Sequence, residues 1–321
     1  MWRGEPTQGR ALVTGGAGFL GSNLVDRLVA EGWEVMVLDN LSTGRLSYLD
    51  DARRFGHITI HQIDIRSEHL AATVAKYSPD RIFHLAAQTS VSASVASPGR
   101  DADINVIGTL NLLESARLAG TSRLVFVSTG GAIYGSEAPL PTPEDAPLSP
   151  ESPYGFSKLI AEQYLDFWGR HHGPVYSIIR PSNVYGPRQD SSGEGGVVAI
   201  FAAACRERKP PTIFGSGHDT RDYVYVDDVV DAIVRAADQE EGGVYNIGTG
   251  VETSTLALFG MVADAAWFKG KPFHGPPRPG DVPRSALECS RARRELGWRP
   301  RIALKDGIKA TVDWFVENRP R

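Results

Sequence analysis

The chain has 321 residues, of which 41% are hydrophobic, and it carries a formal net charge of −4 with an isoelectric point near 6.1. This composition can bury a large core in one large or two ordinary domains, and it lacks the basic surplus that is typical of nucleic-acid binding. No apolar run reaches the roughly 20 residues of a membrane span, and residues 1–10 lack the apolar stretch of a signal peptide. We therefore expect a cytoplasmic protein without nucleic-acid or membrane partners, whose two cysteines, Cys205 and Cys289, are reduced core thiols.

The N-terminal part of the chain alternates short β-rich apolar runs with helical patterns. The predicted strands are 11–14, 34–39, 58–63, 81–85, 123–128 and 175–180, and the predicted helices are 18–31, 68–76, 98–119 and 153–172. Strands separated by helix-length segments are typical of βαβ units. We expect an α/β fold with a doubly wound, Rossmann-like parallel sheet in residues 1–180.

The pattern changes after Pro181, where Gly, Pro and Arg become frequent. A helix at 227–237 and a strand at 244–247 still match the sheet domain, so residues 222–248 are expected to return to it. The other residues of 181–321 are expected to form a smaller C-terminal lobe with fewer helices.

Residues 15–21, Gly-Gly-Ala-Gly-Phe-Leu-Gly, follow the first predicted strand and open the first helix. In such a loop one glycine permits the tight turn, another lets the backbone approach a pyrophosphate, and a third allows close packing of helix and sheet. The helix N-terminus adds N–H groups and a positive dipole. The loop therefore predicts a dinucleotide site.

Asp39 ends the second predicted strand, 18 residues after Gly21. A carboxylate at this place accepts hydrogen bonds from the ribose hydroxyls of adenosine and repels a 2′-phosphate. The nearest arginine, Arg45, lies beyond a Ser-Thr-Gly loop. This arrangement favours NAD over NADP as the cofactor.

Tyr154 and Lys158 are four residues apart in the predicted helix 153–172, so their side chains share one face. Ser152 and Pro153 are suited to start this helix as N-cap and first helical residue. An ammonium beside a phenol favours the phenolate, and lowering the pKa of a tyrosine by about 3 units from about 10 takes about 4 kcal/mol. Given the dinucleotide loop, Tyr154 is a candidate base for a hydroxyl proton.

These motifs resemble those of the extended short-chain dehydrogenase/reductase family, and most closely its nucleotide-sugar epimerases and dehydratases of the UDP-glucose 4-epimerase type. The resemblance extends from about Arg10 to Trp314. It is carried by the blocks 14–21, 39–44, 84–88, 105–109, 128–135, 154–158, 180–187, 220–223 and 278–281. It implies that residues 1–180 bind NAD and that 181–321 bind mainly a nucleotide sugar.

The resemblance also implies the residues of both binding sites, with Asp64 and Ile65 at the adenine and the arginines at the diphosphate of the substrate. The implied cofactor-binding residues are Gly15, Gly18, Phe19, Leu20, Gly21, Asp39, Asn40, Ser42, Thr43, Gly44, Asp64, Ile65, Leu85, Ala86, Ala87, Gln88, Asn105, Tyr154, Lys158, Pro181 and Val184. The implied substrate-binding residues are Thr89, Ser90, Asn183, Val198, Phe214, Arg221, Arg278, Asp281 and Ser285.

The chemistry that the resemblance implies begins with oxidation at C4 of the sugar. Tyr154 takes the proton of the C4 hydroxyl, Lys158 bonds the nicotinamide ribose, and a hydroxyl of Ser128 or Thr129 bonds the sugar oxygen. The sequence departs from the family pattern here. The usual hydroxyl position, counted back from Gly135, is Gly130. Thr129 can take this role only if the loop is shifted.

The fate of the 4-keto sugar separates two reactions. A 4-epimerase reduces the sugar again on its other face, whereas a dehydratase also removes the C5 proton and expels the C6 hydroxyl. Familiar 4,6-dehydratases carry an Asp-Glu pair after the threonine of this loop, where the present chain has 130–132, Gly-Gly-Ala. This favours a 4-epimerase. A dehydratase that uses Tyr154 or Glu194 as its C5 base is the alternative, and a non-catalytic NAD-binding regulator is a remote one.

Two further expectations concern substrate and assembly. Ser285 matches a position that controls room for an N-acetyl group, and its small side chain predicts that a UDP-N-acetylhexosamine fits alongside a UDP-hexose. The predicted helices 98–119 and 153–172 carry apolar residues on more than one face, and family members often pair through them, so we expect a homodimer. No spacing of His, Cys and acidic residues indicates a metal site.

Overall fold

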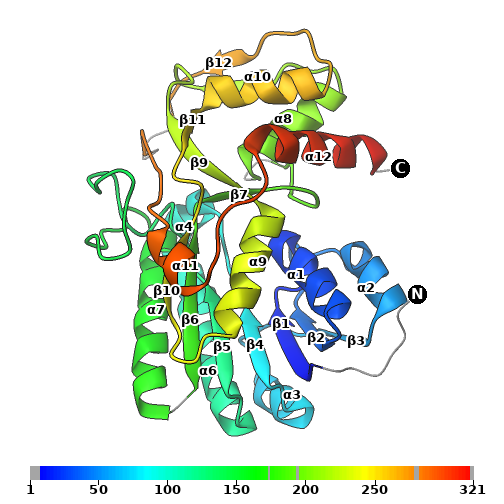
Figure 1. Ribbon diagram of the computed structural model, residues 1–321, viewed down its shortest axis with the longest axis vertical. Helices are drawn as coiled ribbons and strands as arrows, with labels where there is room; N and C mark the ends of the chain where they lie inside the picture. The colour runs from blue at the N-terminus through cyan, green and yellow to red at the C-terminus, as the bar shows by residue number, and fades with distance from the viewer. Residues whose placement is uncertain (1–7, 173, 193–194, 278–281, 319–321) are drawn as a thin grey trace.

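The computed structural model describes residues 8–172, 174–192, 195–277 and 282–318. Its centre is a seven-stranded sheet in the order β10-β6-β5-β4-β1-β2-β3, in which all neighbouring strands are parallel (Figure 1). The strands are β1 (Arg10–Thr14), β2 (Glu34–Asp39), β3 (Ile58–Gln62), β4 (Arg81–His84), β5 (Arg123–Val127), β6 (Val175–Pro181) and β10 (Gly243–Ile247). The doubly wound α/β fold expected from the sequence is confirmed.

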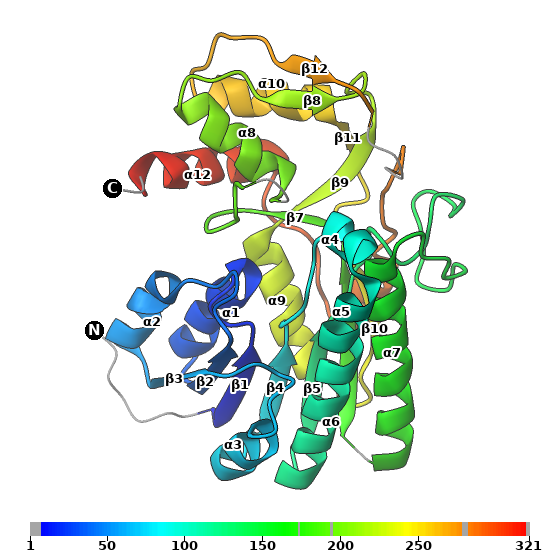
Figure 2. The same ribbon diagram turned by 180° about the vertical axis from the view of Figure 1, so that it is seen from behind.

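Both faces of this sheet are covered by helices. Within β1, Ala11 and Val13 face one hydrophobic cluster and Leu12 faces another, because successive side chains of a strand alternate between its faces. The first cluster contains α1 (Phe19–Ala30) and α9 (Val226–Ala237), and the second contains α3 (Leu70–Tyr77), α6 (Gly108–Ala119) and α7 (Pro153–His172). Figures 1 and 2 show these two helical layers from opposite sides.

The strand order reverses at β1, which pairs with β2 on one side and with β4 on the other. In open α/β sheets, ligands bind in the crevice outside the carboxyl ends of the strands at this reversal. The loops that follow β1 and β4 are therefore the expected place for a cofactor. The short helices η1 (Leu46–Leu49) and α2 (Asp50–Phe55) lie between β2 and β3.

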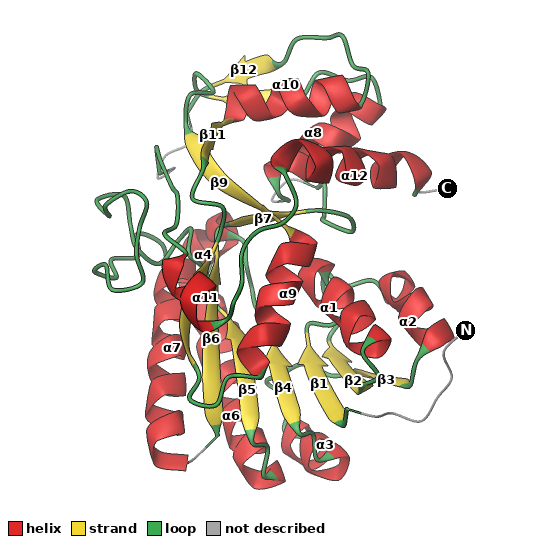
Figure 3. Cartoon of the chain, viewed as in Figure 1, coloured by secondary structure: helices red, strands yellow, loops and turns green. Residues whose placement is uncertain are grey.

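A second layer of structure lies beyond the carboxyl ends of the strands. It contains a three-stranded sheet, β11-β9-β7, and a two-stranded sheet, β12-β8. In Figure 3 the helices of this lobe gather above the large sheet. The lobe elements are β7 (Asn183–Tyr185), α8 (Val197–Arg206), β8 (Thr212–Phe214), β9 (Thr220–Tyr225), β11 (Glu252–Ser254), α10 (Thr255–Ala265), β12 (Phe273–Gly275) and α12 (Leu304–Glu317).

In the described ranges, the half after Pro181 has fewer helices than the first, as expected, but more than the single one predicted there. Besides α9, this half holds α8, α10, α12 and the short α11 (Ser290–Glu295), which packs against β10. The three longer lobe helices pack on one another, and their Ala-, Val- and Leu-rich faces supply part of the main core. The abundant Gly and Pro lie mostly between these helices. As a division of the chain, we propose that 1–180 with 222–248 is one domain and that the other residues after 180 form the lobe.

The predicted helix 98–119 is interrupted, while 153–172 has the expected bounds. The first consists of α5 (Pro98–Ala102), a wider π-helical turn at Asp103–Ile107, and α6. The second begins as expected, because the Ser152 hydroxyl accepts a hydrogen bond from the backbone N–H of Gly155 at 3.1 Å. The π-turn lies beside α7, and such turns are frequent at functional sites.

Candidate active site

The loop between β1 and α1 is shaped for close approach of a ligand. Gly15 has φ +69°, and a Cβ there would lie only 2.7 Å from the backbone nitrogen of Ala86. A Cβ on Gly21 would overlap the carbonyl oxygen of Gly15. The N-cap of α1 is Gly18, which has no side chain to cap the helix, so the N–H groups of the first turn are left for a ligand. These features fit a pyrophosphate.

Asp39 is buried at the end of β2 beside this loop. Its carboxylate accepts hydrogen bonds from the backbone N–H groups of Ala17 at 2.9 Å and of Leu41 at 2.8 Å. A Cβ on Gly44 would lie 2.8 Å from Oδ1 of Asp39, so the loop 40–44 folds closely over the carboxylate. This placement fits an acceptor for ribose hydroxyls, as the sequence predicts.

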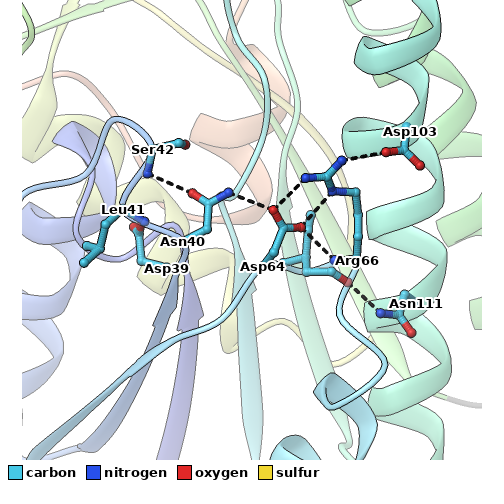
Figure 4. A network of polar contacts seen from close by, with 9 residues as sticks. Asp39, Asn40, Leu41, Ser42, Asp64, Arg66, Asp103 and Asn111 are labelled. Atoms are coloured by element: carbon cyan, nitrogen blue, oxygen red, sulfur yellow. Dashed lines mark hydrogen bonds and ion pairs between the residues drawn. The ribbon is translucent and has the colours of Figure 1, made fainter.

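A chain of polar contacts runs from this loop to the next strand, as Figure 4 shows. Asn40 accepts from the N–H of Ser42 at 3.0 Å and donates to Asp64 at 2.9 Å. Both oxygens of Asp64 accept from the guanidinium of Arg66 at 2.8 Å, and this fork holds the pKa of the Asp64 carboxyl below its ordinary value.

The placement of Arg66 bears on whether the site binds NAD or NADP. Its remaining terminal nitrogen donates to Asp103 at 2.6 Å, so two carboxylates already neutralise it. Arg45, the cation considered from the sequence, lies instead over the ring of Tyr48 at 5.8 Å. Neither arginine is placed beside Asp39 to receive a 2′-phosphate, which favours NAD.

His84 is a buried residue at the end of β4 that forms hydrogen bonds to two neighbouring elements. The sequence predicted no role for it. The Thr109 hydroxyl donates to the carbonyl oxygen of Asn105 at 2.7 Å, so Nε2 of His84, 2.9 Å from that hydroxyl, must carry the proton. Nδ1 then accepts from the Thr14 hydroxyl at 2.8 Å, and Thr14 in turn accepts from the N–H of Ala86. Burial and the nearby Lys158 lower the pKa of His84 to about 3, so the ring stays neutral.

The segment after β4 is fastened to the π-turn. Oδ1 of Asn105 accepts from the N–H of Gln88 at 2.8 Å, and Nδ2 donates to the carbonyl oxygen of Gln88 and to the Ser157 hydroxyl, each at 3.0 Å. Gln88 also accepts from the N–H of Ser90, which is the N-cap of α4 (Val91–Ala96). Leu85, Ala86 and Ala87, the predicted cofactor-lining residues, lie on this fastened segment beside Gly15.

Tyr154 and Lys158 lie on α7 at the carboxyl end of β5. The Lys158 ammonium donates to the carbonyl oxygen of Val127 at 2.7 Å and lies 4.0 Å from the centre of the Phe126 ring. Burial lowers the pKa of Lys158 to about 7 and raises the pKa of Tyr154 to about 12, the latter offset in part by a hydrogen bond with Thr129. In the protein alone desolvation therefore dominates the pKa of Tyr154, and its lowering by Lys158 together with a bound nicotinamide stays a prediction.

The hydroxyl beside Tyr154 comes from Thr129. A Cβ on Gly130 would overlap Cδ1 of Leu287, and the backbone N–H of Gly130 donates to the carbonyl oxygen of Pro181 at 2.8 Å. A side chain therefore has no room at 130, and the loop presents Thr129 to the phenol instead. Ser128 is buried, and its hydroxyl has no hydrogen-bond partner in the described part of the chain.

The lobe contributes several of the predicted substrate residues near this place. Asn183 follows β6 directly and pairs with Tyr223, next to Arg221, whose guanidinium donates to the carbonyl oxygen of Thr220 at 2.9 Å. The N–H of Ser285 donates to the same carbonyl oxygen at 3.2 Å. Asn183, Arg221 and Ser285 are thus held at neighbouring points of β7 and β9.

Other predicted residues are placed differently. Val198 is 1% exposed within α8, and its side chain packs in the core, so a substrate contact through that side chain stays a prediction. Ile65 is also in the core, although its carbonyl oxygen accepts from Asn111 at 2.6 Å. Phe214 is exposed at the end of β8. Arg278, Asp281 and the alternative base Glu194 lie outside the described residues.

A buried ion pair behind the site was missed. Two guanidinium nitrogens of Arg180 on β6 donate hydrogen bonds to the Glu162 carboxylate on α7, at 3.0 Å and 2.6 Å. A third donates to the Tyr134 hydroxyl at 2.8 Å. That hydroxyl donates to Asn246 of β10 at 2.7 Å. An arginine inside the apolar strand 175–181 was the available signal, because a buried guanidinium needs a carboxylate partner.

No helix in the described ranges is long and apolar enough to cross a membrane. In the same ranges, no three His, Cys, Asp or Glu side chains are grouped so that they could hold a metal ion.

The fold is a doubly wound sheet with a glycine loop beside the buried carboxylate of Asp39, and it carries a Tyr/Lys pair beside a threonine. Together these features define a dinucleotide-dependent enzyme of the short-chain type. Comparison with known proteins agrees. The model of the NAD dependent epimerase/dehydratase family matches residues 11–248. A UDP-glucose 4-epimerase of Mycolicibacterium smegmatis is 50% identical over 307 residues, which cover 95% of this chain and 98% of that protein.

Solved structures agree as well. The UDP-glucose 4-epimerase of Thermotoga maritima with UDP-glucose has a TM-score of 0.93 at 44% identity, covering 96% of this chain and 99% of that one. The UDP-glucose 4-epimerase of Thermus thermophilus, in complex with NAD, has a TM-score of 0.88 at 43% identity, covering 95% and 98%. The chain belongs to the NAD dependent epimerase/dehydratase family and is an NAD-dependent enzyme.

Proposed function

We propose that the chain is a 4-epimerase that interconverts UDP-hexoses differing at C4, such as UDP-glucose and UDP-galactose. The observation that carries the proposal is the Thr129 side chain beside the Tyr154 phenol at the carboxyl end of β5, in a loop with no acidic side chain at 130–132. The similarity to UDP-glucose 4-epimerases over nearly the whole chain supports it.

In this proposal the protein's own residues handle the proton. Tyr154 takes the proton of the C4 hydroxyl, and Thr129 holds the sugar oxygen. Tyr154 returns the proton after the 4-keto sugar has turned its other face toward the cofactor. When bound, NAD supplies the acceptor for the two electrons that leave C4 and returns them. Lys158 would bond the nicotinamide ribose with the donors that Val127 does not use.

The shape of the loop after β5 favours epimerisation over dehydration. Loss of water from C5 and C6 needs acid and base steps beyond the transfer of the C4 hydroxyl proton. Gly130 has no room for a side chain, and Gly131 and Ala132 carry no titratable group. The 5,6- or 4,6-dehydratase alternative would therefore depend on Tyr154 acting a second time or on a carboxylate from elsewhere, such as Glu194.

The substrate class follows from the lobe. Arg221 and Asn183, together with Arg278, would bind the diphosphate, because a guanidinium fork suits phosphate oxygens. Ser285 is anchored to β9 by its backbone, and its small side chain would leave room for an N-acetyl group. We therefore propose that UDP-N-acetylhexosamines are accepted alongside UDP-hexoses.

We also propose a homodimer formed through α6 and α7, which lie side by side in Figure 2. The π-turn and these helices expose large apolar side chains that a second copy would cover: Ile107, Leu118, Phe156, Tyr164 and Phe167.

The proposal is tested by incubating the NAD-loaded enzyme with UDP-glucose or UDP-N-acetylglucosamine in deuterated water and recording NMR spectra. We expect the galacto epimer to form without deuterium at C5. Deuterium at C5 and a 4-keto-6-deoxy or unsaturated product would establish the dehydratase instead. Turnover of UDP-glucose without any reaction of UDP-N-acetylglucosamine would overturn the Ser285 proposal alone.

A further inference from the structure

Asp101 of α5 is a buried carboxylate beside the active site for which neither the sequence motifs nor the proposed reaction provides a role. It is 1% exposed, and α5 packs against α7. Its Oδ1 accepts hydrogen bonds from the side chains of Gln88 at 2.7 Å and Asn105 at 3.2 Å. Its Oδ2 is buried and has no partner within the described residues. A buried carboxylate oxygen in that position needs a nearby positive charge or a bound water.

The geometry is that of a carboxylate rather than a carboxylic acid. Both hydrogen bonds are ones that Asp101 accepts, and a proton on Oδ2 would find no acceptor among the residues that the structure describes. The negative charge acts on both groups of the catalytic pair, since it favours the protonated forms of Tyr154 and of Lys158.

The charges around Lys158 show why Asp101 matters to it. Burial disfavours the Lys158 ammonium, and two carboxylates oppose this effect: Glu162, one turn further along α7, and Asp101. Glu162 is already gripped by Arg180 of β6. His84 of β4 is neutral and cannot compensate a positive charge. Asp101 is therefore the opposing carboxylate that no cation in the described ranges already neutralises.

The other charged groups next to Asp101 face away from the pair. Arg100, its neighbour on α5, is exposed, and Asp103 of the π-turn is exposed and paired with Arg66. Because water and salt screen these exposed charges, the buried groups dominate the electrostatic field at Lys158.

We propose that Asp101 is a positioning residue whose carboxylate is the counter-charge that keeps the buried Lys158 in its ammonium form beside Tyr154. The inference rests on the proposed roles of Tyr154 and Lys158. It explains why Gln88 and Asn105 both donate to Oδ1, since this holds the carboxylate in place and leaves Oδ2 without a hydrogen bond in the described part of the chain. It also gives the π-turn a purpose, because Asn105 binds Asp101 and Ser157 with the same amide nitrogen.

The first test is the pH profile of kcat/KM in the NAD-loaded enzyme carrying Asp101→Asn. This substitution keeps the shape and the acceptor for Gln88 and removes the charge. The two limbs of the profile report the ionisations of Tyr154 and Lys158. Because Asp101 favours the protonated form of both groups, both limbs should move to lower pH by about one unit.

Two variants serve as controls for the charge. Glu241→Gln changes the net charge equally at an exposed loop position, and both limbs should stay in place. Asp101→Glu keeps the charge and should hold the limbs near their original pH even where the rate falls. Limbs that do not move in Asp101→Asn, or that move equally in Asp101→Glu, would reduce Asp101 to a structural hydrogen-bond acceptor and overturn the proposal.

A second readout needs no substrate and separates this proposal from the proposed function. Ultraviolet titration of tyrosinate in the NAD-loaded protein, taken as the difference from Tyr154→Phe, isolates Tyr154 from the remaining tyrosines of the 10 in the chain. In Asp101→Asn, Tyr154 should titrate about one pH unit lower. An unmoved titration overturns the Asp101 proposal, whereas a shifted titration without turnover of UDP-sugars would count against the epimerase alone. Asp101→Ser, which leaves space for a water, replaces the asparagine variant if that protein does not fold.

Discussion

At the scale of single residues, Thr129 shows how packing elsewhere selects a functional side chain. The family pattern places the hydroxyl at 130, and the present chain has glycine there. The structure gives a cause, because Leu287 and the backbone of 180–181 fill the space where a Cβ on Gly130 would lie. The loop therefore brings Thr129 to Tyr154.

From this contact we expect Thr129→Val to lower kcat by about 10- to 100-fold with little change in KM, because one hydrogen bond to developing charge is lost. Thr129→Ser should retain most of the rate. Steady-state kinetics with UDP-glucose measure both variants. A valine variant with the original kcat would transfer the role to Ser128.

Tyr154→Phe should lower kcat by at least about 100-fold while NAD still binds, because only the base is removed. The measurement pairs turnover with fluorescence titration of NAD. Tyr164→Phe, on the same helix but exposed, is the matched control and should keep its rate. If Tyr154→Phe retains activity, Tyr154 is not the base that takes the proton of the C4 hydroxyl.

The Asp64–Arg66 fork predicts a pH-dependent stability. Because the folded-state pKa of Asp64 lies below its ordinary value of 3.8, its stabilisation is complete above that value and is lost as the pH falls through the folded pKa. Arg66→Met should cost about 1 kcal/mol of unfolding free energy near pH 7, discounted for its partly exposed side chains, and almost nothing well below pH 3. Urea denaturation at both pH values measures this. Arg53→Met, at an exposed and longer ion pair, should cost less at either pH, and an Arg66→Met deficit independent of pH would contradict the assignment.

At the scale of elements, the sequence was most informative where local signals were strong. Helix α7 has the predicted bounds, because Ser152 and Pro153 mark its start and its length is sustained by a regular pattern. The strands β2 and β6 agree within one residue with their predictions. The π-turn at Asp103–Ile107 had no local signal, since it depends on how Asn105 meets Gln88 and Ser157 from other elements.

The lobe helices were missed for a related reason. Helices α8, α10 and α12 lie between Gly- and Pro-rich segments, and their apolar faces are satisfied only by packing on one another. Within the site, the local motifs predicted the glycine loop, Asp39 and the Tyr154/Lys158 pair. The charged groups around the site, Asp101 near Lys158 and Arg66 on Asp64, come from other segments and emerge only from the folded chain.

The Arg180–Glu162 pair joins β6 to α7 and predicts a large stability effect, because the two side chains are only 5% and 6% exposed. Glu162→Leu should cost about 3–5 kcal/mol, since it leaves the guanidinium buried without its partner. The double variant Glu162→Leu/Arg180→Met should recover part of this loss. Denaturant unfolding measures both, with Asp313→Leu, at an exposed ion pair of α12, as the control that costs about 1 kcal/mol or less. A single variant at 162 as stable as the control would show that the pair contributes little.

At the scale of the whole molecule, the sheet and the lobe bring the two halves of the chain to one place. Asp222, wholly buried on β9, accepts hydrogen bonds from the N–H groups of Thr249 at 2.8 Å and Gly250 at 3.0 Å, just after β10. It also accepts from the N–H of Leu287, the residue that fills the space beside Gly130. Leu287 of the lobe is thereby tied to Asp222 and packs beside the loop that carries Thr129, so movement of the lobe would reach the hydroxyl that we propose to be catalytic.

Assembly is the last property that the surface predicts. Leu118 of α6 and Phe167 of α7 are 56% and 45% exposed, and large apolar side chains gathered on two adjacent helices mark an interface. We expect the protein to sediment as a dimer at micromolar concentration. The double variant Leu118→Glu/Phe167→Glu should sediment as a monomer with an unchanged circular dichroism spectrum, because four glutamates would face apolar surface across a twofold interface. Val316→Glu, at a similarly exposed position on α12, should leave the dimer intact. A monomeric parent protein, or a double variant that still dimerises, would place the interface elsewhere or remove it.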